Sequence, residues 1–120
     1  MKKKEKTLLY ERIKQEVEFD IIKGNYQSTD KFPTITDFSA KYECGKNTAQ
    51  NVLNMLEEDG ILVKSNNSYY LKPLIRERLL KKHKNILGQQ IDKMFKMANI
   101  VGITEDEIKA RVLKYINHEK

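Results

Sequence analysis

Side chains suited to binding nucleic-acid bases recur at helical spacing in the middle of this chain. Lys46 and Gln50 are four residues apart, as are Asn47 and Asn51, so all four share one side of a helix. A lysine ammonium is attracted to phosphate and guanine, and a glutamine or asparagine amide fits adenine N6 and N7. The carboxylates of this segment lie at its far end, at 57–59. This polarity predicts a helix whose N-terminal half enters a major groove of DNA.

Hydroxyl and amide side chains elsewhere are predicted to support the same contact. Three threonines stand at expected helix starts, where a hydroxyl can donate to a phosphate oxygen. Two asparagines stand in an expected hairpin loop. The candidate DNA-binding residues are therefore Thr34, Thr36, Lys46, Asn47, Thr48, Gln50, Asn51, Asn66 and Asn67.

Patterns typical of catalysis and metal binding are missing from the sequence. It contains no glycine-rich phosphate loop and no nucleophile with a plausible histidine and aspartate pair. His83 and His118 have no partners at metal-ligand spacing. An enzyme is therefore the least supported class, and we expect no catalytic residues, metal or cofactor.

Three helices must position the candidate residues. Apolar side chains at every fourth position over 7–23 predict an amphipathic helix, which Gly24 ends. Pro33 fits the first turn of a second, short helix over 34–42. A tight turn at 43–45 leads to the third helix, 46–58, whose apolar side consists of Ala49, Val52, Leu53 and Leu56.

A β-hairpin is predicted to follow these helices. The runs 61–63 and 69–71 are β-prone, and the polar residues 64–68 between them include asparagines, which tolerate positive φ. Three helices followed by a hairpin predict a winged helix-turn-helix domain over 1–72, in a mainly α protein.

The residues after Pro73 follow a different pattern, and we expect a second part over 73–120. Apolar positions over 74–98 fall on one face of a long helix that Gly102 breaks, and Thr104 with Glu107 forms a capping box for a last helix. Two helices beyond a complete winged helix have little of their own chain to bury against, so a homodimer is predicted. The candidate dimerisation residues are Leu80, Leu87, Ile91, Met94, Phe95, Ile108, Val112 and Ile116.

The net charge of +6 favours a polyanionic partner, but it is unevenly distributed. Residues 1–72 carry 12 lysines and arginines against 11 acidic residues, and residues 73–120 carry 11 against 6. DNA binding by the first part must therefore depend on where its charges lie. A basic cluster on the long helix is open to two interpretations, a solvated surface or contact with flanking phosphates; it consists of Arg76, Arg78, Lys81, Lys82 and Lys84.

A cytoplasmic location without a membrane partner is expected. No apolar run is long enough to span a bilayer, and no apolar segment of a secretory signal follows the charged start. The single Cys44 cannot form an internal disulfide, which fits a reducing compartment.

The order and spacing of these parts resemble the DNA-binding domain of the GntR family. The resemblance covers about residues 8–72 and includes Gly24-Asn-Tyr26, Phe32-Pro-Thr34, Lys46-Asn-Thr48 and the run from Leu56 to Leu62. It implies a transcription regulator that binds double-stranded operator DNA. The two-helix tail is similar to that of the YtrA-like subfamily, in which a short helical segment mediates dimerisation, and this similarity implies repression of a transporter operon.

The chain departs from the family pattern at three positions that usually hold arginine. They are occupied here by Thr36, Lys46 and Gln50. Because arginine holds guanine through two hydrogen bonds and glutamine suits adenine, we expect a target richer in A·T pairs. The hairpin loop also has asparagines where members often carry Gly-x-Gly, which leaves its minor-groove contact open.

Two further questions stay open from the sequence. A winged helix can serve as a protein-interaction module instead of a DNA-binding one, and the near-neutral first part is compatible with that alternative. A small-molecule effector would have to bind at the tail junction or the dimer seam, and no residue identifies one.

Overall fold

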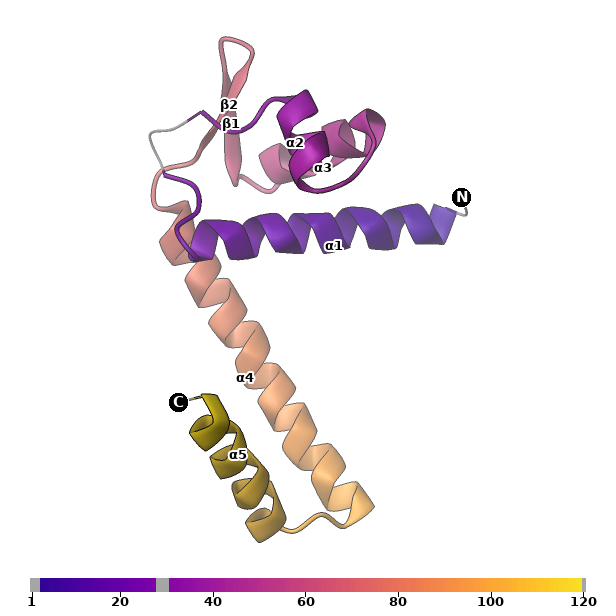
Figure 1. Ribbon diagram of the computed structural model, residues 1–120, viewed down its shortest axis with the longest axis vertical. Helices are drawn as coiled ribbons and strands as arrows, with labels where there is room; N and C mark the ends of the chain where they lie inside the picture. Colours follow the sequence, from indigo (N-terminus) through magenta and orange to yellow (C-terminus); the bar gives the residue numbers. More distant parts are fainter. Residues whose placement is uncertain (1–2, 28–30, 120) are drawn as a thin grey trace. The chain divides into compact units, whose positions relative to one another are not determined.

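The computed structural model describes residues 3–27 and 31–119, and the side chains of residues 8–27 and 31–118. Two compact units are present, one up to Lys81 and one from Lys82 onward. The described elements are α1 (Lys3–Ile22), α2 (Ile35–Lys41), α3 (Lys46–Glu58), β1 (Leu62–Ser65), β2 (Ser68–Leu71), α4 (Ile75–Val101) and α5 (Glu105–Glu119) (Figure 1). They confirm the predicted mainly α fold, a winged helix-turn-helix followed by C-terminal helices.

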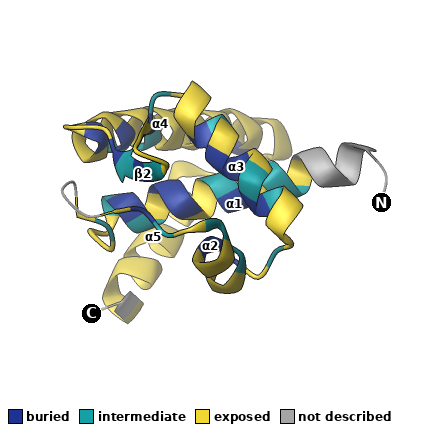
Figure 2. Cartoon of the chain, turned by 90° about the horizontal axis from the view of Figure 1, so that it is seen from above, coloured by how far each residue is buried: buried dark blue, intermediate teal, exposed yellow. Residues whose placement is uncertain are grey.

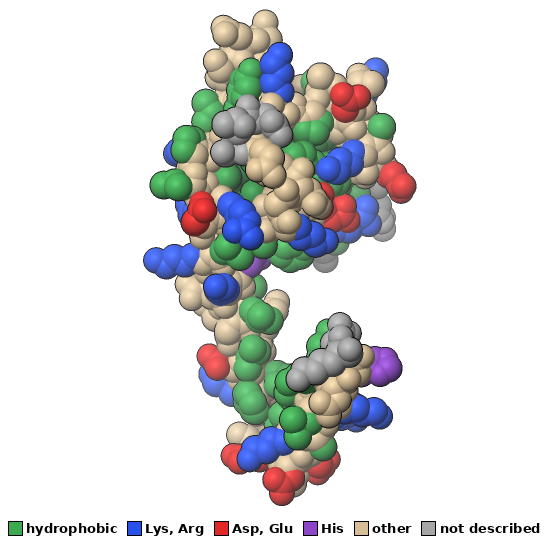
Figure 3. Space-filling model, turned by 60° about the vertical axis from the view of Figure 1, so that its left-hand side comes forward, with side chains coloured by type: hydrophobic (Ala, Val, Ile, Leu, Met, Phe, Trp, Pro, Cys, Tyr) green, Lys and Arg blue, Asp and Glu red, His purple; other side chains and the backbone are tan. Residues whose placement is uncertain are grey.

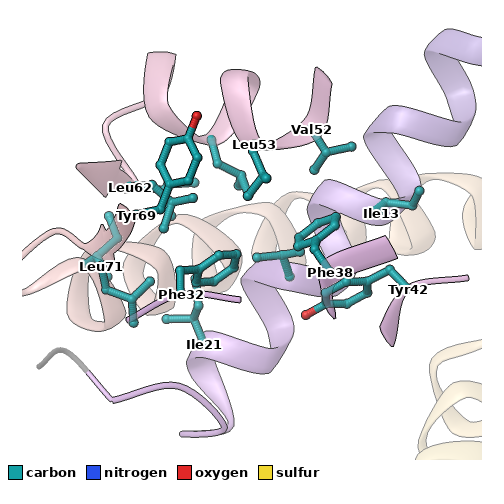
Figure 4. Close-up of a cluster of buried hydrophobic side chains, with 14 of the residues drawn as sticks. Ile13, Ile21, Phe32, Phe38, Tyr42, Val52, Leu53, Leu62, Tyr69 and Leu71 are labelled. Atoms are coloured by element: carbon teal, nitrogen blue, oxygen red, sulfur yellow. The ribbon is translucent and has the colours of Figure 1, made fainter. Parts of the chain in front are cut away.

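One continuous hydrophobic core joins the helices of the first unit to the hairpin. Val17 of α1, Phe38 of α2 and Leu53 of α3 have no exposed surface. Phe32 and Tyr69 extend the core toward the hairpin (Figure 4). The buried positions on α1 and α3 recur at three- and four-residue spacing, which is why the sequence pattern located both helices.

The hairpin is tighter than the sequence indicated. β1 and β2 pair antiparallel from Leu62↔Leu71 to Ser65↔Ser68, so only Asn66 and Asn67 remain in the turn instead of the five-residue loop expected over 64–68. Both asparagines have positive φ, 50° and 65°, as the central residues of a type I′ turn require.

Two expected helix starts were wrong. α1 begins at Lys3, earlier than the expected residue 7. Pro33 precedes α2 and is not in its first turn, because Thr34 is the N-cap and its hydroxyl accepts from the Asp37 backbone N–H at 3.2 Å. Before α2, Lys31 forms an isolated bridge with Tyr70 of β2, and the Phe32 N–H donates to the Tyr69 carbonyl at 2.7 Å.

The start of α4 belongs to the winged-helix unit. Ile75 and Leu79 are buried in its core, and the first compact unit extends to Lys81. Two arginines of the predicted basic cluster bind carbonyls at helix ends: Arg76 Nε donates to Ile22 O at 2.8 Å, and Arg78 Nη2 donates to Asp59 O at 2.7 Å. Their charges therefore lie at the negative ends of α1 and α3.

The second unit is a helical hairpin of α4 and α5 in which few side chains are buried. Thr104 and Glu107 form the predicted capping box: the Glu107 N–H donates to the threonine hydroxyl at 3.2 Å, and the Thr104 N–H donates back to the Glu107 carboxylate at 3.5 Å. Ala98 is the one buried hydrophobic residue among the described side chains of this unit. Figures 2 and 3 show α5 almost wholly exposed and hydrophobic side chains on the surface of this unit.

The helices α1 to α4 end in the same hydrogen-bonded motif, in which a residue one or two positions after the helix has positive φ. In α1, α3 and α4 this residue is Gly24, Gly60 or Gly102, but in α2 it is Glu43, with φ 50°. The Cys44 N–H then donates to Ser39 O at 3.0 Å, as the Asn25 N–H donates to Asp20 O at 2.9 Å after α1. A side chain with a β-carbon is strained in this conformation, so the turn before α3 carries strain that the other three avoid.

We predict that Glu43→Gly stabilises the protein and that Gly24→Ala destabilises it, each by about 1 kcal/mol. The two changes are matched because a β-carbon at Gly24 meets no atom within 4 Å, so its effect comes from the backbone alone. Urea unfolding followed by circular dichroism measures both. Shifts of the same sign in the two variants would contradict this explanation.

Candidate nucleic-acid interface

The exposed face of α3 carries the predicted base-contacting side chains together. Lys46, Asn47 and Asn51 are exposed, and Gln50 is half-buried at the edge of the face. Gln50 Nε2 donates to Asn54 Oδ1 at 2.9 Å, and Asn51 Nδ2 donates to the Tyr10 hydroxyl at 3.0 Å. The face is therefore a set of amides and one ammonium, with hydrogen bonds within the protein that orient two of the amides.

The N-terminus of α3 is open to an anion. Gly45 is its N-cap and provides no side-chain cap, and no acidic residue stands in the first turn. Because the first backbone N–H groups of a helix have no partner within the helix, they are available to a phosphate oxygen beside the positive end of the helix dipole. Thr48, half-buried in this first turn, adds a hydroxyl.

A groove of about 610 Å³ lies between the start of α2, Gln50 of α3 and the hairpin. Thr34 and Thr36 line it on one side, and Lys64 and Asn67 line it on the other. The Thr34 hydroxyl accepts its capping bond and still has a hydrogen to donate. The groove thus joins the predicted threonines and one of the hairpin asparagines to the exposed face of α3, while Asn66 is exposed at the tip of the hairpin.

This surface also includes Tyr10, Asn54 and Lys64, which were not among the residues predicted from the sequence. Asn54 is four residues after Gln50, so helical spacing alone could have indicated it. Lys64 precedes the hairpin turn and lies with its ammonium 5.7 Å from the centre of the Tyr69 ring. Tyr10 is on α1, and no local pattern connects it with Asn51.

A chain of hydrogen bonds fixes α2 against α1. The Tyr42 hydroxyl, after α2, donates to Asp20 Oδ2 of α1 at 2.7 Å and lies 2.7 Å from the Tyr26 hydroxyl. Asn25 Nδ2 donates to the other oxygen of Asp20 at 3.0 Å, and the Lys41 ammonium lies 4.3 Å from the centre of the Tyr26 ring. Because α2 carries the threonines of the groove, this network helps to set their position.

Cys44 lies in the turn between α2 and α3, where it is half-buried against the core. Burial raises the pKa of its thiol, which favours the unreactive protonated form. Among the described residues, no group of three or more histidine, cysteine, aspartate or glutamate side chains is placed to hold a metal ion.

Residues 9–68 match the family model of the bacterial regulatory proteins of the gntR family. The chain belongs to the GntR family. It therefore has the fold of a DNA-binding transcription regulator, and the matched residues include α2, α3 and the hairpin turn. No curated protein matches the sequence at a significant level.

Several solved structures share the fold of this chain. A GntR family transcriptional regulator from Listeria monocytogenes is 26% identical, with a TM-score of 0.66, over 88% of this chain and 92% of that one. A GntR-family regulator from Bacteroides thetaiotaomicron shares the fold at 17% identity, with a TM-score of 0.71, over 92% and 99% of the two chains. BusR from S. agalactiae, solved with its promoter DNA, has 20% identity and a TM-score of 0.53 over 78% and 53%.

Within residues 3–27 and 31–119, no helix of this GntR-family protein combines the length and the apolar character that crossing a membrane requires.

We predict that Tyr42→Phe lowers the free energy of unfolding at pH 7 by about 1–3 kcal/mol, because Asp20 loses a donor. Burial, followed by the hydrogen bonds to Tyr26 and Asp20, raises the pKa of Tyr42 well above its ordinary value of 10. The folded state therefore keeps this proton where the unfolded chain releases it. The stabilisation is complete below pH 10 and is lost as the pH rises above it, by up to about 1.4 kcal/mol per pH unit.

Urea unfolding at pH 7, 10 and 11 measures this dependence, with Tyr115→Phe on α5 as the control variant. Tyr42→Phe should lose less stability than the wild-type protein between pH 10 and 11. Equal losses in the two proteins would show that the Tyr42 proton is not coupled to folding.

Proposed function

We propose that this GntR-family protein is a sequence-specific repressor that binds a palindromic operator as a homodimer in the bacterial cytoplasm. The observation that carries the proposal is the composition of the exposed face of α3. Lys46, Asn47, Gln50 and Asn51 lie together at a helix N-terminus without a side-chain cap, and the carboxylates of α3 lie at its other end. Such a surface attracts phosphates and presents amides to base edges.

Dimerisation is supported by the apolar surface of the second unit. Leu87, Ile91 and Met94 of α4 are between 42% and 55% exposed, and Val112 and Ile116 of α5 are more than 40% exposed. A cavity of about 570 Å³ lies between Phe95 of α4 and residues 108–113 of α5. A monomer rarely exposes so many neighbouring apolar side chains, and a second copy of the same hairpin would cover them in a four-helix arrangement.

The candidate dimerisation residues differ in their surroundings. Phe95, Ile108, Val112 and Ile116 are half-buried or exposed in the second unit, and we assign them with Leu87, Ile91 and Met94 to the proposed seam. Leu80 belongs to the first unit, is half-buried there, and follows the core residue Leu79. The short two-helix tail supports a place in the YtrA-like subfamily, which the sequence resembles.

A dimer would place two copies of α3 in successive major grooves, about 34 Å apart, so the operator would be palindromic. Occupancy of such a site within a promoter would exclude RNA polymerase, which is the proposed route to repression. The amides that replace the family's arginines would favour adenine over guanine at the bases they contact.

The alternative function is a winged-helix module that binds another protein. The salt dependence of binding distinguishes the two functions. Binding through several phosphates weakens log-linearly with salt concentration, whereas binding through a protein interface responds weakly. Lysine and backbone N–H groups at the start of α3 favour the DNA-binding function.

We predict that Lys46→Ala weakens binding to duplex DNA and lowers the slope of log K against log salt by about one, because one phosphate contact is lost. Fluorescence anisotropy at about 50–200 mM salt measures the slope on a duplex from the region upstream of the gene. Lys23→Ala, which removes an exposed lysine after α1, is the control and should leave the slope unchanged. An unchanged slope in Lys46→Ala would contradict its role, and absence of binding at low salt would favour the protein-interaction module.

We predict that Ile91→Asp converts the protein to a monomer and weakens operator binding at least tenfold, because a carboxylate cannot be buried in an apolar seam. Light scattering after size exclusion gives the mass, and circular dichroism confirms that the helices persist. Ile100→Asp is the control: Ile100 is 78% exposed and lies outside the apolar stripe of α4, so this variant should stay dimeric. A dimeric Ile91→Asp, or a monomeric Ile100→Asp, would contradict the proposed seam.

A further inference from the structure

The amide of Asn51 is held by a residue from another helix. Its Nδ2 donates to the Tyr10 hydroxyl at 3.0 Å, across 41 residues of sequence. The Tyr10 ring is half-buried and packs against the hydrophobic core, whereas Asn51 is exposed on α3. The core thus fixes the ring, and the hydroxyl at its end fixes an amide on the surface predicted to face DNA.

A second amide on the same face is held within α3. Gln50 Nε2 donates to Asn54 Oδ1 at 2.9 Å, one helical turn further along. Gln50 and Asn51 are therefore both oriented before any ligand binds, one by its own helix and one by α1.

These internal hydrogen bonds leave the groups that adenine requires. A side-chain amide has two N–H hydrogens and one acceptor oxygen, and each internal bond occupies one hydrogen. The second hydrogen can be donated to adenine N7 while the oxygen accepts from the adenine N6 amino group. Guanine presents two acceptors, N7 and O6, at the same edge, so its O6 would face the amide oxygen without a hydrogen between them.

Because the Asn51 amide is oriented before DNA binds, it can discriminate more strongly between adenine and guanine. An exposed side chain that becomes fixed on binding loses rotamer freedom, which opposes the bond that it forms. Asn51 has given up much of that freedom already through the bond to Tyr10. A freely rotating amide could also turn over and offer N–H groups to guanine. Here that would break the Nδ2–H bond to the Tyr10 hydroxyl, which would have to reorient before it could donate to Oδ1.

We propose that Tyr10 is a positioning residue for base recognition, which holds the Asn51 amide in the orientation that selects adenine. This inference rests on the proposed function, since it assigns a specificity determinant to the same DNA-binding surface. Asn54 has the corresponding role for Gln50. Tyr10 itself needs no contact with a base.

The test begins with selection of duplexes from a random library by the wild-type full-length protein, which defines a consensus operator. Binding is then measured on the consensus duplex and on duplexes with each single base replaced. Asn51→Ala identifies the base pair that Asn51 contacts, as the position at which discrimination is lost. Tyr10→Phe keeps the packed ring and removes only the hydroxyl, and its melting temperature shows whether the fold is unchanged.

We expect Tyr10→Phe to reduce the preference for adenine at that one position by about three- to tenfold, while binding to a scrambled duplex stays the same. In the Asn51→Ala background, Tyr10→Phe should change nothing further. Asn54→Ala is the matched control, and it should reduce discrimination at a different base pair, the one that Gln50 contacts.

Two results would overturn the inference while leaving the proposed function intact. One is unchanged discrimination at the Asn51 position in Tyr10→Phe, and the other is an equal loss of affinity for all duplexes, which indicates a purely structural role. If the wild-type protein selects no consensus at all, the proposed function fails, and the inference fails with it.

Discussion

Burial of one side of α3 is the constraint on which the DNA-binding surface depends. Ala49, Val52, Leu53 and Leu56 have no exposed surface, and together they fix the rotation of α3 about its own axis. With that rotation fixed, the side chains at positions 46, 47, 50, 51 and 54 must face away from the core. The surface that we propose to contact DNA is thus a consequence of hydrophobic packing. A polar substitution in the buried stripe would disturb DNA binding through the orientation of the helix.

The segments around α3 are held by interactions of other kinds. The Tyr42–Asp20 hydrogen bond connects α2 to α1, and Arg78 binds the carbonyl at the end of α3 from the first turns of α4. Residues with positive φ end the helices α1 to α4. Glu43, in the turn before α3, is the one among them that is not a glycine. Hydrophobic burial provides a common core, and these polar contacts connect the ends of neighbouring helices around it.

Much of the fold could be predicted from the sequence because its signals are local. The four-residue spacing in α1, the stripe in α3, the glycines after helices and the capping box at Thr104 each depend on neighbouring residues. What the sequence did not indicate includes several long-range contacts. Lys31 pairs with Tyr70, and Ile75 and Leu79 enter a core whose other members are far away in sequence. Nothing local distinguishes Leu79, which is buried there, from Leu80, which is half-buried.

The candidate site shows the same difference between residues found from local spacing and partners that depend on long-range packing. Lys46, Asn47, Gln50 and Asn51 could be found by spacing, and the structure brings them onto one face. The partners that orient the amides, above all Tyr10, could not be found, because the hydrogen bond to Asn51 depends on how α1 packs against α3. For Arg76 and Arg78 the sequence left two roles open, a solvated surface or phosphate binding. In the structure both side chains donate to carbonyls at helix ends.

We propose that the exposed face of α3, with the start of α2 and the hairpin turn, is the surface that contacts DNA. Nuclear magnetic resonance of the ¹⁵N-labelled protein, titrated with a selected duplex, measures which backbone amides respond to DNA. We expect the largest backbone amide shifts within 34–36, 46–54 and 66–67, with smaller changes elsewhere in the winged-helix unit. Saturable shifts concentrated on other surfaces, with these segments unchanged, would contradict it.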